Sequence, residues 1–94
     1  MMSEGFQVLI APQPEWEPNT IVHKNNGTGS HTSFEIAAMK EGKKNVFYVP
    51  DDKGIVVGDV LQRIGESIFW EITKLDVITY LGVQRLLAKV RKLN

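Results

Sequence analysis

The sequence predicts a mainly β fold, a small antiparallel meander or barrel built by the 94 residues as a single domain. Two observations lead to this prediction. Short apolar segments rich in β-branched and aromatic residues follow one another along the chain, and each ends at a turn signal. Short strands joined by tight turns are typical of antiparallel sheets and small barrels.

The N-terminal third predicts an extended arm and a flexible loop, together spanning residues 12–33. Pro12, Pro14 and Pro18 exclude a helix and favour a polyproline-like arm. The stretch 23–33 is rich in Asn, Gly, Ser and Thr, which predicts a loop. Alternatively, Asn26-Gly27 closes a hairpin, because Asn-Gly is the preferred type I′ turn. The loop is preferred because Gly and Ser continue beyond that pair.

The β core is predicted to span residues 34–93. Its strands alternate with segments rich in Gly, Pro, Asp and Lys, which favour turns. The predicted strands are 34–40, 46–49, 60–64 and 67–73, and the turns between them include 41–44, 50–54 and 65–66. Gly58-Asp59, directly before a strand, predicts a tight bend in which the Asp carboxylate accepts backbone amides. We therefore interpret Asp59 as a structural residue.

The C-terminal segment, residues 83–93, fits either a strand or a helix. As a strand, it points Leu86, Ala88 and Val90 inward. As a helix, it also places apolar residues at helical spacing, and its composition favours helix. The strand is preferred because a barrel needs a closing strand to remove an exposed edge.

Alternation within the turn-bounded segments also predicts the hydrophobic core. In most of these strands, every second apolar residue is assigned to the interior. The predicted core residues are Phe34, Ile36, Val46, Tyr48, Val60, Ile68, Trp70, Ile72 and Val90.

Composition narrows the function classes. The chain has no cysteine, and its 11 basic residues balance 11 acidic ones, so no overall field attracts nucleic acid or a membrane. No apolar run approaches the roughly 20 residues that span a bilayer. The N-terminus lacks the basic start and apolar stretch of a signal peptide, so secretion is not expected.

The titratable residues predict no catalytic, metal or cofactor site. His23 and His31 lie in polar sequence without further ligands at metal-binding spacing, and we interpret both as solvated loop residues. Ser30 beside His31 lacks an orienting acid, and the Gly-rich segment around Gly29 lacks the Lys-Ser/Thr ending of a phosphate-binding loop. We expect a protein that is not an enzyme.

Candidate partner-binding residues come from two regions. Trp16, with Ile21 and Val22, places apolar side chains in the predicted arm, where a tryptophan is suited to anchor a protein partner. Lys89 and Arg91 belong to a C-terminal basic cluster with Lys92, and a second cluster comprises Lys40, Lys43 and Lys44. The two clusters could contact phosphates if they shared one side, but aromatic stacking residues are missing near both. Solvation of strand edges is therefore the preferred interpretation.

The segments 57–63, 69–73 and 87–92 resemble a pattern in small β proteins of tailed phages and prophages, the head–tail connector and head-completion proteins. The shared pattern is a Gly-Asp step, a strand, a turn, an aromatic strand and a closing strand, over roughly the last 40 residues. The resemblance implies an SH3-like or related small barrel without catalytic residues. It also implies a homo-oligomeric or ring-like assembly, located in the cytoplasm of a bacterial host or in the virion.

Two functions are therefore expected. The first is a non-enzymatic structural or assembly protein that acts through protein–protein contacts. Its support is the Pro/Trp arm and the loop, which are too long to be simple connections between strands. The alternative is a small binding module for single-stranded nucleic acid or a regulatory protein, using the basic clusters.

Overall fold

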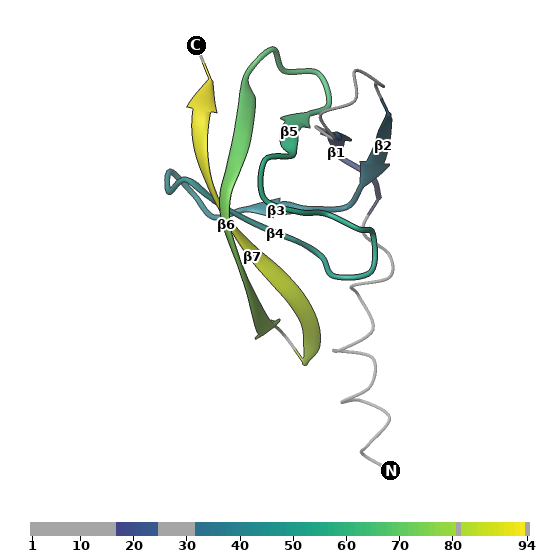
Figure 1. Ribbon diagram of the computed structural model, residues 1–94, viewed down its shortest axis with the longest axis vertical. Coiled ribbons are helices and arrows are strands. Elements are labelled where there is room, and N and C mark those ends of the chain that lie inside the picture. The colour runs from purple at the N-terminus through teal and green to yellow at the C-terminus, as the bar shows by residue number, and fades with distance from the viewer. Residues whose placement is uncertain (1–16, 25–31, 81, 94) are drawn as a thin grey trace.

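A computed structural model describes residues 17–24, 32–80 and 82–93, and all of the secondary structure in these residues is β (Figure 1). The strands are β1 (Thr20–His23), β2 (Ser33–Ile36), β3 (Met39–Lys40), β4 (Val46–Pro50), β5 (Val60–Arg63), β6 (Phe69–Tyr80) and β7 (Val83–Leu93). The described residues include no helix able to cross a membrane. The antiparallel β class predicted from the sequence is confirmed.

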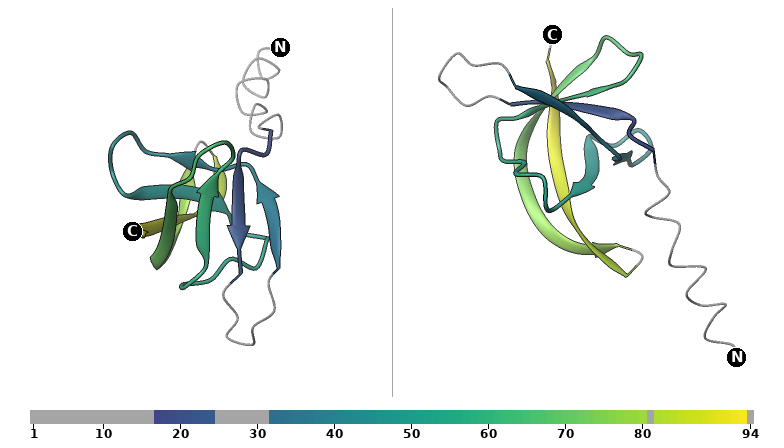
Figure 2. Two further views of the ribbon diagram at one scale, coloured as in Figure 1. Left: turned by 90° about the horizontal axis from the view of Figure 1, so that it is seen from above. Right: turned by 90° about the vertical axis from the view of Figure 1, so that its right-hand side faces the viewer.

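One sheet contains all seven strands, in the order β2-β1-β5-β6-β7-β4-β3. Four of its six neighbouring pairs are consecutive in the chain, as in a meander, whereas β1–β5 and β4–β7 join distant segments. Residues 37 and 38 alone link β2 to β3, although these strands stand at opposite ends of the order. Two residues reach about 10 Å, whereas the edges of a flat seven-stranded sheet lie about 29 Å apart. The sheet must therefore curl around one interior, as Figure 2 shows.

Asn19 hydrogen-bonds the short link between β2 and β3, the two edge strands of the curled sheet. Its side-chain amide donates to the Ala38 carbonyl at 2.8 Å, and its side-chain oxygen accepts the Ala38 N–H at 3.0 Å. The backbone of Asn19 also bonds to Ile36 and Ile64, at 2.9 Å each. Because Ala38 is buried and belongs to no strand, these bonds satisfy backbone groups that the sheet leaves unpaired.

The interior confirms part of the predicted core and shifts the rest by one residue. Ile36, Trp70, Ile72 and Val90 are buried as predicted, and Phe34 and Ile68 pack partly against the core. Val46, Tyr48 and Val60 are only half-buried, so their prediction as core residues was wrong. Their strands instead bury Phe47, Val49 and Leu61, each with 0% exposure.

The residues around position 20 also correct the predicted organisation. Residues 20–23 were assigned to the arm and loop, but they form β1, which lies inside the sheet between β2 and β5. The core therefore begins well before residue 34, because β1 supplies the pairing edge that both neighbours need. β1 and β2 form a hairpin, and its connecting residues 25–31, with Asn26-Gly27, lie outside the described residues, as do 1–16.

The C-terminal segment is a strand, β7, as preferred. It pairs with β6 over its whole length and with β4 over Arg85–Lys89. Ala88 and Val90 point inward and are buried, and Leu86 packs against the core, in agreement with the strand interpretation. The predicted strand 34–40 is instead broken at residues 37–38 into β2 and β3.

Candidate interaction surface

The structure separates the three apolar residues predicted to bind a partner through the arm. Trp16 lies outside the described residues. Ile21 is half-buried on β1, with its side chain on the face opposite the core. Val22 has 0% exposure and packs in the core, so it contributes to the domain's own interior and presents no surface to a partner.

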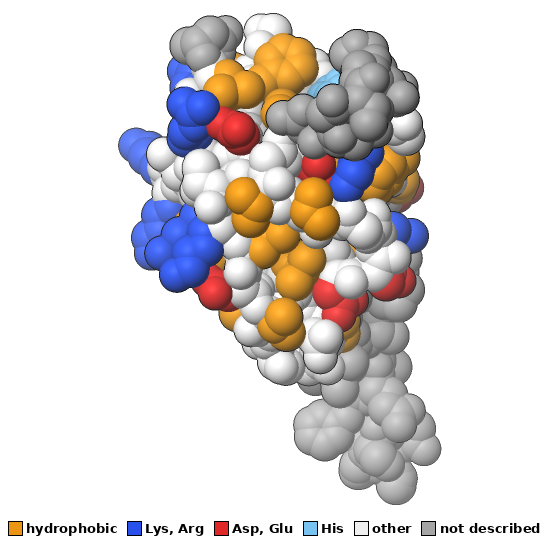
Figure 3. All heavy atoms as spheres, in the orientation of Figure 1, with side chains coloured by type: hydrophobic (Ala, Val, Ile, Leu, Met, Phe, Trp, Pro, Cys, Tyr) orange, Lys and Arg blue, Asp and Glu red, His pale blue; other side chains and the backbone are white. Residues whose placement is uncertain are grey.

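The two basic clusters meet at one end of the molecule. The Val90 N–H donates to the Asn45 carbonyl at 3.1 Å, and Val46 lies opposite Lys89. The turn carrying Lys43 and Lys44 therefore lies beside the end of β7. In Figure 3, Lys and Arg side chains gather along the left edge.

Carboxylates reduce the positive charge of this end. Arg91 bonds Glu71 on the opposite strand, through Nη2 at 2.6 Å and Nε at 2.7 Å. Lys89 is exposed and lies opposite Lys74. The Nζ of Lys74 lies 3.9 Å from Oδ2 of Asp76. Arg91 thus contributes a cross-strand ion pair, whereas Lys89 projects into solvent beside a second lysine.

The turn between β3 and β4 is fixed by its own side chains. The Tyr48 hydroxyl donates to Glu41 at 2.6 Å, and this hydrogen bond, with the nearby Lys44 ammonium, lowers the pKa of the Glu41 carboxyl below its usual value. Lys40 donates to the carbonyls of Gly42 and Lys44, and its ammonium lies 5.1 Å from the centre of the Trp70 ring. The Lys40 ammonium is therefore fixed by contacts within the protein.

An ion pair with a buried carboxylate joins Lys24, directly after β1, to the connection between β4 and β5. The Lys24 ammonium bonds the Asp59 carboxylate and the Gly54 carbonyl, at 2.6 Å each. The same carboxylate accepts the Val56 N–H at 3.0 Å, and Asp59 is fully buried. This geometry is the backbone-capping role predicted for Asp59, with an ammonium partner that the sequence did not indicate.

His23 is not the solvated loop residue that the sequence suggested. It belongs to β1, its Nε2 lies 2.9 Å from Oε1 of Gln62, and its ring packs 5.7 Å from Phe69. His31 lies outside the described residues. Within the described ranges, no three His, Asp or Glu side chains are grouped as they would be to hold a metal ion.

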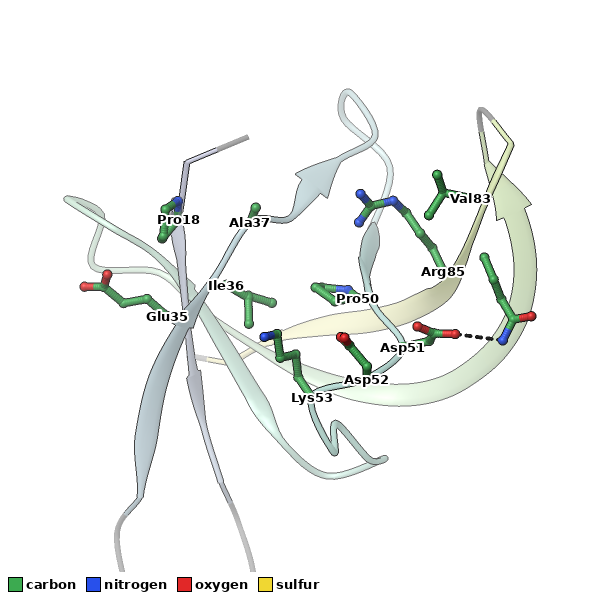
Figure 4. A pocket seen from close by; sticks show the side chains of 11 residues that line it. Pro18, Glu35, Ile36, Ala37, Pro50, Asp51, Asp52, Lys53, Val83 and Arg85 are labelled. Carbon is green, nitrogen blue, oxygen red and sulfur yellow. Dashed lines mark hydrogen bonds between the residues drawn. The ribbon is translucent and has the colours of Figure 1, made fainter. Parts of the chain in front are cut away.

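A pocket of about 430 Å³ lies where the end of β2, the segment after β4 and the start of β7 converge (Figure 4). The buried Arg85 side chain reaches into it from β7, and Asp51 turns away to accept a 2.7 Å hydrogen bond from Gln84. Glu35, Asp52 and Lys53 complete a lining of mixed charge. This mixture favours neither an anionic nor a cationic ligand.

The β6–β7 hairpin extends beyond the strands that flank it. β5 pairs with β6 only at Phe69–Glu71, and the bonds of Gly58 and Asp59 to Ile72 end that contact. A bulge follows between Ile72 and Lys74. From Lys74 to Tyr80, β6 has β7 on one side and no described strand on the other. This segment is the free edge of β6.

Exposed apolar residues lie around the free edge. Val77, within it, is 65% exposed, and Val56 and Val57, just before the Gly58 contact to β6, are 51% and 55% exposed. Figure 3 shows hydrophobic side chains over the lower part of the hairpin and the β4–β5 connection. This surface was not predicted from the sequence, because no strand or turn was expected for residues 74–82. The alternation of Leu75 and Val77 with Lys74 and Asp76 was the available signal.

Comparisons of the chain with protein-family profiles, with curated proteins and with solved structures found no match.

Proposed function

We propose that the protein is a non-enzymatic structural or assembly protein that forms a homo-oligomer through protein–protein contacts. The observation that carries this proposal is the free edge of β6 beside Val56, Val57 and Val77. An unpaired edge offers backbone donors and acceptors to another chain, and natural proteins usually cover such edges or keep them short. Here the edge is long and bordered by apolar side chains, which suits a contact surface.

The kind of assembly follows from the resemblance to head–tail connector and head-completion proteins of tailed phages. The Gly58-Asp59 bend, the aromatic strand β6 and the closing strand β7 are the residues that carry that resemblance. We propose a role of this kind, in a virion or in the cytoplasm of a bacterial host. In this role Trp16 and Ile21 remain candidates for a further contact with a neighbouring subunit.

The mass of the full chain in solution tests this function. Size-exclusion chromatography with light scattering, over a series of protein concentrations, is expected to show species heavier than the 10.6 kDa chain. A chain that stays monomeric at every concentration up to about 100 μM, where even weak self-association would appear, contradicts the proposal. Trp16→Ala, measured in the same series, tests the arm separately.

A second candidate function is binding of single-stranded nucleic acid. The observation that favours it is the meeting of the two basic clusters beside Asn45 and Val90. A polythymidine oligonucleotide titrated at several salt concentrations tests it, because each neutralised phosphate adds about −0.7 to the slope of log affinity against log salt. Lys43→Glu/Lys44→Glu should abolish binding, and Lys53→Glu, outside this end, should not.

A further inference from the structure

We propose that two copies of the chain pair through the free edges of β6, antiparallel and about a two-fold axis, with Val77 opposite Val77 of the second copy. This inference rests on the proposed function and names the partner and the contact. The contact continues the sheet of one copy into the sheet of the other.

The hydrogen-bonding direction of each residue in β6 follows from its neighbours. The Val90 N–H points toward β4, because it donates to Asn45. Alternation along an antiparallel strand then points Arg85, Leu87 and Lys89 toward β6, where they face Ile78, Asp76 and Lys74. The backbone groups of Leu75, Val77 and Thr79 therefore point away from β7, to the free edge.

Only one antiparallel self-pairing uses all of these outward groups. With Val77 opposite itself, Leu75 of each copy lies opposite Thr79 of the other, so every outward residue meets an outward residue. Moving the axis to Asp76 places two carboxylates opposite each other and brings Thr79 against the bulge at Thr73. Moving it to Ile78 places Leu75 opposite residue 81, beyond the end of β6.

The surroundings of the edge also fit a second copy. The pairing buries the exposed Val77 against the same residue, and it brings the turn of each hairpin toward the exposed Val57 of the other copy. β5 pairs with β6 only as far as Glu71, so no described strand pairs with this edge from Lys74 onward. The formal net charge of zero imposes no overall repulsion between two copies. This one contact pairs the free edge of β6 in both copies, so the assembly closes at two chains.

Opposite charges at position 77 test the pairing on the full chain. Val77→Lys and Val77→Glu should each weaken self-association by about 100-fold, because like charges then face each other across the axis. An equimolar mixture of the two should restore a dimer, since Lys then faces Glu. Val77→Thr, which keeps the β-branched shape, is the matched control and should remain dimeric. Circular dichroism checks that each variant is folded.

Hydrogen exchange of the unmodified chain gives a measurement that needs no variant. The amides of Leu75, Val77 and Thr79 should exchange more slowly as concentration rises, whereas the amide of Val56, bonded to Asp59 within one copy, should not change. Equal exchange of the first three amides at high and low concentration would overturn the inference.

The outcomes separate this inference from the proposed function. A dimer lost in both charge variants and restored in the mixture supports both. Self-association that the charge variants leave intact, or a ring of more than two copies, supports the function and overturns the two-fold pairing. Loss in the single variants without restoration in the mixture also overturns it, because Val77 then meets another residue. A monomer at every concentration overturns both.

Discussion

Removal of the Asp59 carboxylate should destabilise the fold strongly. This carboxylate is fully buried and links β1 to the connection between β4 and β5 through Lys24 and the Val56 N–H. Asp59→Ala removes a charge-assisted hydrogen bond, which contributes about 1.5–3 kcal/mol, and leaves an amide unpaired, which costs about 1–3 kcal/mol. Lys24 is 21% exposed and retains its bond to Gly54, so part of this cost is recovered through water.

We therefore expect Asp59→Ala to lower the free energy of unfolding by about 3 kcal/mol, and Asp59→Asn, which keeps an acceptor oxygen, by about 1–2 kcal/mol. Lys24→Met should cost about 3 kcal/mol, because it leaves the buried carboxylate without its ammonium. Urea unfolding at neutral pH, at a fixed protein concentration, measures all three variants.

Glu66 provides the matched control. Its Oε2 lies 3.9 Å from Nε of Arg63, and both side chains are more than two-fifths exposed. Glu66→Ala should change the free energy of unfolding by less than about 1 kcal/mol. If Asp59→Ala destabilises no more than Glu66→Ala does, the buried pair does not hold the β4–β5 connection and the reasoning fails.

Three further predictions address the interior and the edges. Trp70→Ala should cost about 3–5 kcal/mol in urea unfolding. Trp70→Phe should cost clearly less, because the buried Nε1 has no hydrogen-bond partner among the described residues; equal costs would contradict this. Asn19→Ala should lower the free energy of unfolding by about 2 kcal/mol, because it leaves the N–H and C=O of Ala38 without their side-chain partner. An unchanged urea midpoint would show that water replaces the Asn19 side-chain amide. The lowered pKa of Glu41 contributes stability above the ordinary carboxyl pKa that is lost as pH falls through the lowered value. Tyr48→Phe should raise this pKa in an NMR titration, and an unchanged pKa would exclude the hydrogen bond as its main cause.

The sequence predicted the β class because turn chemistry is local. The Glu41–Lys44 turn and the Gly58-Asp59 bend lie where their residue types placed them. The inward face of β6 was also predictable, because Trp70 and Ile72 alternate with Glu71 and Thr73. Local alternation of this kind determines which side faces the core.

The remaining features depend on partners far away in the chain. Residues 46–49 are apolar at every position, so alternation could not choose between the two faces. Pairing decides, because Phe47 lies between Lys40 and Ala88 and thereby faces the interior. β1 was hidden for a similar reason, since its four residues pair with strands on both sides and its flanks resemble a loop. The free edge was equally hidden, because it depends on where β5 stops.

The β6–β7 hairpin also bears on the order in which the chain folds. It is the longest strand pair, and residues 81 and 82 alone connect it, so it can form on the microsecond scale of isolated hairpins. β4 must close a far larger loop before it pairs with β7, and β1 a similarly large one before it reaches β5. We expect the hairpin to act as the template onto which β5 and β4 add from opposite sides. Until β5 and β4 add, both sides of the template are open, so the newly made chain is most prone to misassociation at its earliest folded stage.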